Sequence, residues 1–146
     1  MMIAIGSDHA GFPLKQEIKQ FLDEQGVEYL DVGCFEPVSC DYPDIAEALC
    51  AKITAGECDK GLLFCGTGIG ISMAANKVKG IRAACCDDYF SAKYTRLHND
   101  ANVLCMGGRV VGPGEACEIV NVFLNTGFEG GKHARRVEKI AALEEK

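Results

Sequence analysis

The stretch "LLFCGTGIGIS", from Leu62 to Ser72, decides the fold of this chain. Its first four residues are apolar and complete the segment "KGLLFC" (60–65), as in a buried strand, and three glycines at alternate positions follow. A buried strand, a glycine turn and a helix in this order form the repeating unit of parallel α/β sheets. The stretch therefore predicts a strand over 60–65 and a helix over 69–76.

The rest of the chain repeats this alternation of apolar runs and helical patterns. Strands are expected over 2–6, 28–33, 60–65, 80–86 and 101–107, with helices between them, a further helix near Pro113 and a charged last helix over 134–145. The strands are nearly continuous in apolar residues, as in parallel sheets that are covered on both faces. The sequence thus predicts a three-layer α/β/α sandwich with a five-stranded parallel Rossmann-like sheet and a C-terminal helix, forming a single domain over 1–146.

Composition and charge exclude several classes of function. The formal net charge of −6 argues against generic nucleic-acid binding, and the glycine-broken apolar stretches are too short to cross a bilayer. The start "MMIAIGSDHAG" lacks the basic segment of a signal peptide. Nine cysteines without C-x-x-C spacing indicate reduced thiols rather than a zinc ribbon. We expect a cytoplasmic protein without nucleic-acid or membrane partners.

The predicted topology indicates where a site should lie. In open α/β sheets, ligands bind beyond the carboxyl ends of the strands. Asp8 and His9 follow the first expected strand, Cys65 to Gly70 the third, and Gly107 to Arg109 the fifth. The opening stretch therefore falls where a ligand should bind.

The glycine turn and its thiol suggest chemistry on an anion. Backbone N–H groups at a glycine turn, with the positive end of a helix dipole, can hold phosphate or an oxyanion. Neither a dinucleotide fingerprint nor a P-loop fits, because Ile71 replaces the third glycine and no Lys-Ser/Thr pair follows. The same donors would stabilise a thiolate at Cys65, which could act as nucleophile or general base, and Thr67 adds a hydroxyl. Tight packing of small residues is the alternative interpretation of the turn.

Three further polar motifs have both a functional and a structural interpretation. Asp8 and His9 precede a helix, so Asp8 could simply cap it. His98 and Asn99 precede the fifth strand, where a histidine could be an ordinary turn residue. The basic cluster near the C-terminus could clamp phosphate or form a solvated helix start. It consists of Lys132, His133, Arg135 and Arg136.

Taken together, these motifs resemble the ribose-5-phosphate isomerase B family, which includes allose-6-phosphate and galactose-6-phosphate isomerases. The resemblance spans nearly the whole chain in the same order. It rests on "SDHAG" (7–11), "DYPD" (41–44), "CGTGIGISMAANKVKGIRAA" (65–84), "HNDANVL" (98–104) and "GGKHARRV" (130–137).

The resemblance implies an aldose–ketose isomerase that needs no metal or other cofactor and acts on a small sugar phosphate. It would interconvert ribose 5-phosphate and ribulose 5-phosphate, in the pentose phosphate pathway, through an enediolate. By matching position, Cys65 would be the base, and His98, assisted by Asp8, would open the sugar ring. The enediolate oxygen would be held by Thr67 together with Gly66, Gly68, Ile69 and Gly70. Asn99 would contact the sugar, and the phosphate or hydroxyls would be contacted by His9, Arg109 and Arg136. Lys132 stands where the family usually has arginine, so it could neutralise phosphate without a bidentate contact.

Topology adds an expectation about assembly. Cys65 ends a strand, whereas His98 precedes one, so the two belong at opposite edges of the sheet. A six-residue strand spans about 20 Å. We therefore expect a two-fold homodimer, or a dimer of dimers, whose site combines Cys65, Asp8 and His9 of one subunit with His98 and Arg136 of the other.

Other functions stay open at this point. The substrate could be allose 6-phosphate or galactose 6-phosphate, because specificity depends on the room at the far end of the sugar. A flavodoxin-like module could bind phosphate or nucleotide without turnover. A redox sensor could use Cys65 or the adjacent pair Cys85 and Cys86.

Overall fold

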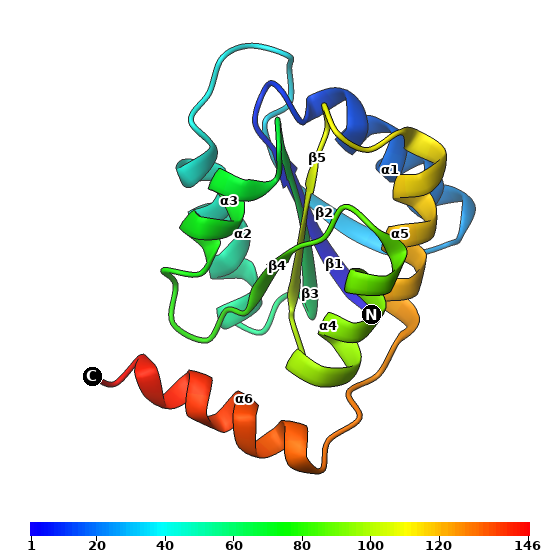
Figure 1. Cartoon of the computed structure of the whole chain (residues 1–146). Helices are drawn as coiled ribbons and strands as arrows, with labels where there is room; N and C mark the ends of the chain where they lie inside the picture. Colours follow the sequence, from blue (N-terminus) through cyan, green and yellow to red (C-terminus); the bar gives the residue numbers. More distant parts are fainter.

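Five parallel strands form one sheet in the order β2-β1-β3-β5-β4 (Figure 1). The computed structural model describes residues 1–146. The strands are β1 (Met2–Ser7), β2 (Glu28–Gly33), β3 (Lys60–Cys65), β4 (Ala83–Cys85) and β5 (Val103–Gly107). The predicted Rossmann-like α/β architecture is confirmed.

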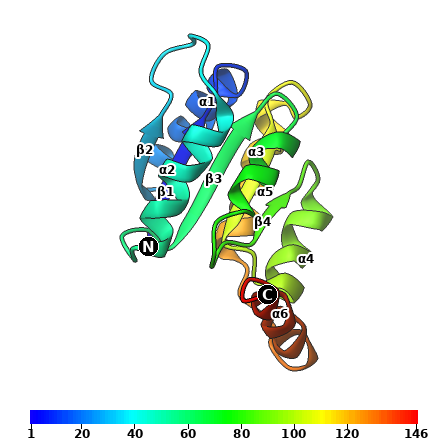
Figure 2. The same ribbon diagram turned by 90° about the vertical axis from the view of Figure 1, so that its left-hand side faces the viewer.

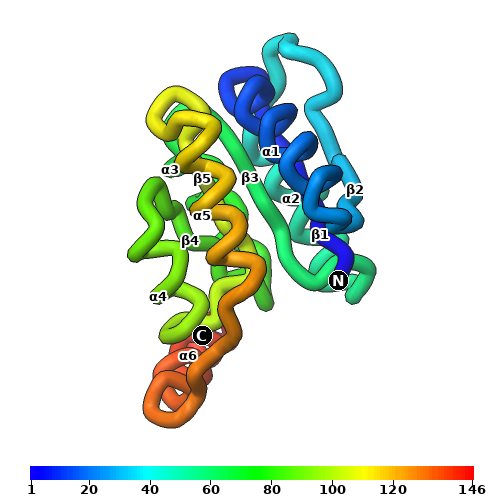
Figure 3. Tube along the Cα trace, turned by 90° about the vertical axis from the view of Figure 1, so that its right-hand side faces the viewer, coloured from blue at the N-terminus to red at the C-terminus, as the bar shows by residue number.

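Five of the six helices cover the two faces of this sheet. They are α1 (Phe12–Glu24), α2 (Tyr42–Thr54), α3 (Ile69–Ala75), α4 (Tyr89–Asn99) and α5 (Pro113–Asn125), and α6 (Lys132–Leu143) follows. Helices α2 and α3 lie on one face and α1, α4 and α5 on the other (Figure 2). Helix α6 packs against α4 at the end of the sheet where the strands begin (Figure 3). None of the helices has the length and apolar character that crossing a membrane would need.

The apolar residues of each central strand alternate between two cores. In β3, Leu62 and Phe64 join the core beneath α1 and α5, whereas Leu63 and Cys65 join the core beneath α2 and α3. This alternation follows from the two-residue period of a strand. It directs the Cys65 side chain toward the α2–α3 face, at the carboxyl end of β3.

The order in which the chain adds strands reverses between β1 and β3. The chain places β2 on one side of β1, then returns to β3 on the other side and continues to the edge strand β4 before it adds β5 between β3 and β4. The loop after β1 crosses the end of β3 so closely that a Cβ on Gly11 would lie 2.3 Å from the Phe64 carbonyl oxygen. The loops after β1 and β3 therefore meet at the crevice where ligands bind in such sheets.

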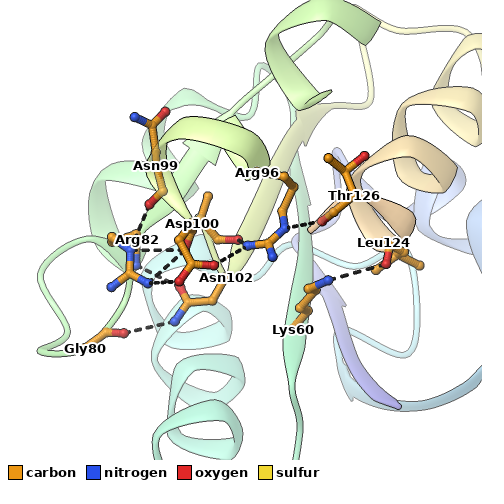
Figure 4. A network of polar contacts seen from close by, with 10 residues as sticks. Lys60, Gly80, Arg82, Arg96, Asn99, Asp100, Asn102, Leu124 and Thr126 are labelled. Atoms are coloured by element: carbon orange, nitrogen blue, oxygen red, sulfur yellow. Dashed lines mark hydrogen bonds and ion pairs between the residues drawn. The ribbon is translucent and has the colours of Figure 1, made fainter. Parts of the chain in front are cut away.

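Several boundaries differ from the sequence prediction. The first strand, expected over 2–6, covers Met2–Ser7, and the fifth, expected over 101–107, covers Val103–Gly107. The fourth strand was expected over 80–86, but β4 covers only Ala83–Cys85. Side chains hold the segment before it: Asn102 accepts from the Arg82 amide and donates to the Gly80 carbonyl oxygen, and the Arg82 guanidinium binds the Asp100 carbonyl oxygen (Figure 4). The last helix begins at Lys132 rather than at residue 134.

A buried ion pair fixes α1 to β2. Lys15 is fully buried, and its Nζ lies 2.8 Å and 3.0 Å from the two carboxylate oxygens of Asp31 and also donates to the Cys34 carbonyl oxygen. Lys19 donates to the same carboxylate at 2.9 Å. Burial alone would raise the pKa of Asp31, but hydrogen bonds from both lysines lower it below its ordinary value.

Replacing Asp31 with asparagine should destabilise the fold by about 3–5 kcal/mol at neutral pH, because Lys15 then stays buried without its charge partner. Asp31 stabilises the protein above its unfolded-state pKa of about 3.9, and this contribution is lost as pH falls through the lower folded-state pKa. Urea unfolding should therefore show a difference between wild type and Asp31→Asn that narrows below pH ~4.

The matched control is Lys79→Gln, which breaks the exposed ion pair with Glu145 and should change the free energy of unfolding by at most about 1 kcal/mol. If Asp31→Asn were no less stable than this control, the buried ion pair between Lys15 and Asp31 would not stabilise the fold as proposed.

Candidate active site

The turn after β3 presents the Cys65 sulfur to backbone donors. Cys65 is 4% exposed, and its Sγ accepts a hydrogen bond from the Gly68 N–H at 3.1 Å. Thr67 Oγ1 accepts from the Ile69 N–H at 3.2 Å, while the amides of Gly66 and Gly70 make no backbone hydrogen bond. A donated N–H favours negative charge on sulfur, and the free amides can bind an oxyanion.

Two of the glycines are required by close neighbours. Gly68 has a φ of +82°, and a Cβ there would lie 2.8 Å from the Met106 carbonyl carbon. A Cβ on Gly70 would lie 2.7 Å from the Tyr42 ring. The turn is therefore clamped between β5 and α2, and side chains at these positions would displace it.

A cavity of about 420 Å³ opens beside this turn. Seven of the predicted site residues line it, namely Asp8, His9, Cys65, Gly66, Thr67, Gly70 and Arg109. Gly68 and Ile69 belong to the same turn, and the Ile69 side chain is half exposed. The structure thus brings a thiol, an imidazole, a carboxylate and a guanidinium to one wall.

Backbone hydrogen bonds order three of the charged or polar residues of this wall. Asp8 is buried, and its Oδ1 accepts from the Gly11 N–H at 2.9 Å, so the carboxylate orders the loop just before α1. His9 Nδ1 accepts from the Cys40 N–H at 3.4 Å, which leaves Nε2 as the donor of neutral His9. The Arg109 amide donates to the Gly66 carbonyl oxygen at 3.1 Å, and its guanidinium lies over Gly66.

The loop from β2 to α2 supplies lining residues that were absent from the predicted site. They are Ser39, Cys40, Asp41 and Tyr42. The motif "DYPD" at 41–44 marked this region, but only as part of the family resemblance. Burial and the neighbouring Cys34 thiol raise the pKa of Cys40 to about 11, so this second thiol of the cavity stays protonated at neutral pH.

The remaining predicted residues lie at the opposite end of the sheet (Figure 1). His98 and Asn99 end α4, and Lys132 and Arg136 belong to the first turns of α6. None of the four lines the cavity beside Cys65. The His98 ring stacks on that of His133, with centroids 4.0 Å apart, and partial burial and His98 lower the pKa of His133.

A larger cavity, of about 650 Å³, lies between α6 and the segment before β4. Asn99 lines it, but no thiol or imidazole does. Two of its other polar residues are already paired, Arg82 with Asp100 and Asn76 with the Ala83 backbone. We therefore place the chemistry in the smaller cavity beside Cys65.

A parallel α/β fold with a thiol and free backbone amides at the ligand-binding edge of its sheet contains the groups that an enzyme needs to move a proton beside a carbonyl group. A family model described as Ribose/Galactose Isomerase matches residues 3–140, and the chain belongs to this family. The protein is accordingly a sugar-phosphate isomerase.

Two relatives match it along nearly their whole length. Ribose-5-phosphate isomerase B of Escherichia coli is 49% identical over 99% of this chain and 97% of its own. D-erythrulose-4-phosphate isomerase of Pectobacterium atrosepticum is 44% identical over 99% and 95%.

Solved structures show the same fold. Ribose-5-phosphate isomerase B of Clostridium thermocellum is 50% identical, with a TM-score of 0.98 over 99% of this chain and 98% of its own. The enzyme of that name from Mycoplasma genitalium, with bound ribulose 5-phosphate, is 41% identical, with a TM-score of 0.94 over 99% and 97%.

Gly68→Ala should disrupt the turn, because a Cβ meets the β5 backbone and φ is positive. We expect a loss of about 1–3 kcal/mol in the free energy of unfolding and a changed alkylation rate of Cys65. Gly127→Ala is the control, since nothing lies within 4 Å of its Cβ position. Equal stability and equal rates of Cys65 alkylation in both variants would show that the turn does not require glycine at position 68.

Proposed function

We propose that this sugar-phosphate isomerase interconverts ribose 5-phosphate and ribulose 5-phosphate, with Cys65 as the base and without a metal or other cofactor. The observation that carries the proposal is the hydrogen bond from the Gly68 N–H to Cys65 Sγ, in the wall of a cavity that also contains His9 and Arg109. His9 and Arg109 can contact the phosphate or the hydroxyls of a small anionic sugar.

The proton transfer balances within the substrate. The Cys65 thiolate removes the C2 proton of the open aldose, and the electron pair moves through C1 to the carbonyl oxygen, O1. The enediolate passes its remaining hydroxyl proton from O2 to O1, and the thiol returns its own proton to C1, which leaves a ketone at C2. The free amides of Gly66 and Gly70 and the Thr67 hydroxyl hold the charged oxygen, each good donor being worth about 3 kcal/mol.

Ring opening needs a second acid–base group, because the cyclic sugar hides its carbonyl. The ring oxygen must gain a proton while the C1 hydroxyl loses one. Imidazole suits this exchange near neutral pH, and we assign it to His98, assisted by the buried carboxylate of Asp8. In the same scheme Asn99 contacts the sugar, and Lys132 and Arg136 neutralise the phosphate.

A second copy of the chain would bring these groups together, because one chain holds Cys65 and His98 at opposite ends of the sheet. We propose a two-fold homodimer, alone or paired into a tetramer. Exposed apolar side chains on α4 and α6 support such a contact: Phe90 is 69% exposed, Leu143 63% and Ile140 45%.

The choice of ribose 5-phosphate gains support from the bound ribulose 5-phosphate of the Mycoplasma genitalium relative. The Pectobacterium relative carries the name of a different sugar-phosphate isomerase, so the family accommodates several substrates. Allose 6-phosphate and galactose 6-phosphate are therefore the competing candidates. We place the activity in the cytoplasm, with no nucleic-acid or membrane partner.

The deciding assay compares turnover of ribose 5-phosphate, allose 6-phosphate and galactose 6-phosphate by wild type and by Cys65→Ala. Ribose 5-phosphate should be isomerised with the highest kcat/KM, EDTA should leave the rate unchanged, and Cys65→Ala should lower kcat by about 10²–10⁴-fold.

Cys117→Ala, which removes a half-buried thiol on α5, is the control and should keep wild-type turnover. Binding of the sugar phosphates without turnover would instead favour a binding module. Equal rates for Cys65→Ala and Cys117→Ala would exclude Cys65 as the base.

Site sharing can be tested by complementation. Neither Cys65→Ala nor His98→Asn subunits should be active alone. Mixing them after reversible dissociation should restore about a quarter of wild-type activity, because half of the dimers are mixed and each has one intact site. Native mass spectrometry would verify the mixed dimers, and inactivity of those dimers would rule out a shared site.

A further inference from the structure

Two imidazoles and a carboxylate converge at the junction of α4 and α6. They are His98 at the end of α4, Glu129 in the connection from α5, and His133 in the first turn of α6. His98 Nε2 lies 3.7 Å from one carboxylate oxygen of Glu129, and His133 Nε2 lies 4.0 Å from the other. One ligand atom from each of the three residues lies within 4.8 Å of the other two.

Backbone contacts hold the three donors together without a ligand. The Glu129 amide donates to the Leu97 carbonyl oxygen at 3.0 Å, which places the backbone of Glu129 beside the end of α4 that carries His98. The His133 amide donates to the Gly130 carbonyl oxygen at 3.1 Å and closes the turn into α6. The Tyr94 ring meets His98 edge-on at 5.1 Å.

A buried arginine anchors the connection from α5 that carries Glu129. Arg96 is 7% exposed, and its Nε donates to the Thr126 carbonyl oxygen at 3.0 Å (Figure 4). Its Nη1 donates to Asp100 Oδ1 at 2.9 Å, which ties the same guanidinium to the end of α4. The segment bearing Glu129 is therefore fastened to α4 close to His98.

We propose that His98, Glu129 and His133 form a binding site for one divalent transition-metal ion of the zinc type. Two imidazoles and one carboxylate are a donor set that zinc accepts, with a fourth position left to water. Tetrahedral zinc with bonds of about 2.0–2.1 Å needs ligand atoms roughly 3.3 Å apart. The three ligand atoms lie within 4.8 Å of one another, so they must move closer together. The His98 and His133 rings, stacked with 9° between their planes, must also rotate out of the stack so that both Nε2 atoms point at one ion. His98 and Glu129 are partly exposed, which leaves room for this rotation.

The surrounding charges select the kind of metal. Lys132 and Arg136 lie close enough to act on His133, and their positive charges oppose any cation at the site. Magnesium and calcium, which prefer oxygen ligands, gain too little from two imidazoles to overcome this repulsion. Zinc binds imidazole strongly enough to do so.

The ion would be an inhibitor rather than a cofactor. This consequence rests on the proposed function, in which His98 exchanges a proton with the sugar ring. A metal on Nε2 occupies the lone pair that this exchange requires. Zinc should therefore slow the isomerisation of ribose 5-phosphate reversibly, and EDTA should restore the zinc-treated enzyme.

The test separates metal binding from activity. Isothermal titration with zinc chloride, under reducing conditions, compares wild type with Glu129→Gln, His133→Asn and the control Glu138→Gln, whose side chain is exposed on α6 outside the cluster. The two ligand variants should weaken zinc binding by roughly tenfold or more, whereas Glu138→Gln and wild type should agree. Magnesium should give no heat of binding at this site.

If His133→Asn fails to fold, Glu129→Gln still tests the site, because the Glu129 side chain is exposed and its replacement should not disturb folding. Anomalous diffraction at the zinc edge from soaked crystals should place the ion between the two imidazoles. Zinc found only on cysteines, or equal affinities in all four proteins, would overturn the site. Zinc bound at the cluster in a chain that isomerises no sugar would uphold the site and reject the proposed function instead.

Discussion

The hydrogen bond from the Gly68 amide to the Cys65 sulfur exists only because residue 68 has no side chain. Gly68 has a φ of +82°, and an added Cβ would lie 2.8 Å from the Met106 backbone, so a side chain at this position would displace the turn from β5 and from the thiol. The conformation with glycine aims the amide at sulfur, leaves the Gly66 and Gly70 amides without backbone partners and starts α3. Because β3 lies between β1 and β5, the same turn faces the loop that carries Asp8 and His9.

A parallel sheet places the end of every strand at one edge and the start of every strand at the other. The thiol lies at the first edge, and the imidazole of His98 lies at the second, beside α6. This polarity is the physical reason for proposing a site between two copies of the chain. It also leaves His98 beside His133 and Glu129, in a cluster whose geometry suits a metal ion. The His98 side chain would then serve both in ring opening and as a ligand of the inhibitory zinc ion.

Much of this arrangement could be predicted from the sequence because local patterns set it. The apolar run over 60–65 and the glycines after it gave the strand β3 and the start of α3 to the residue. The segment 80–82 could not be assigned in this way, because Asn102 and Asp100, distant in sequence, replace the strand ladder there. The lining residues Ser39 to Tyr42 could not be predicted from local patterns either, because they lie in the irregular loop after β2 and at the start of α2, where the sequence has no periodicity. The stacking of His98 on His133 depends on the path of the connection between α5 and α6.

The turn after β3 is the place where we expect the reacting carbons of the sugar to bind. A crystal structure with ribulose 5-phosphate bound tests this most directly. We expect C1 and C2 of the sugar roughly 3–3.5 Å from Cys65 Sγ, with the carbonyl oxygen on the amides between Gly66 and Gly70 and the phosphate against basic side chains of a second copy. A sugar whose C1 and C2 lie away from the sulfur would contradict the account.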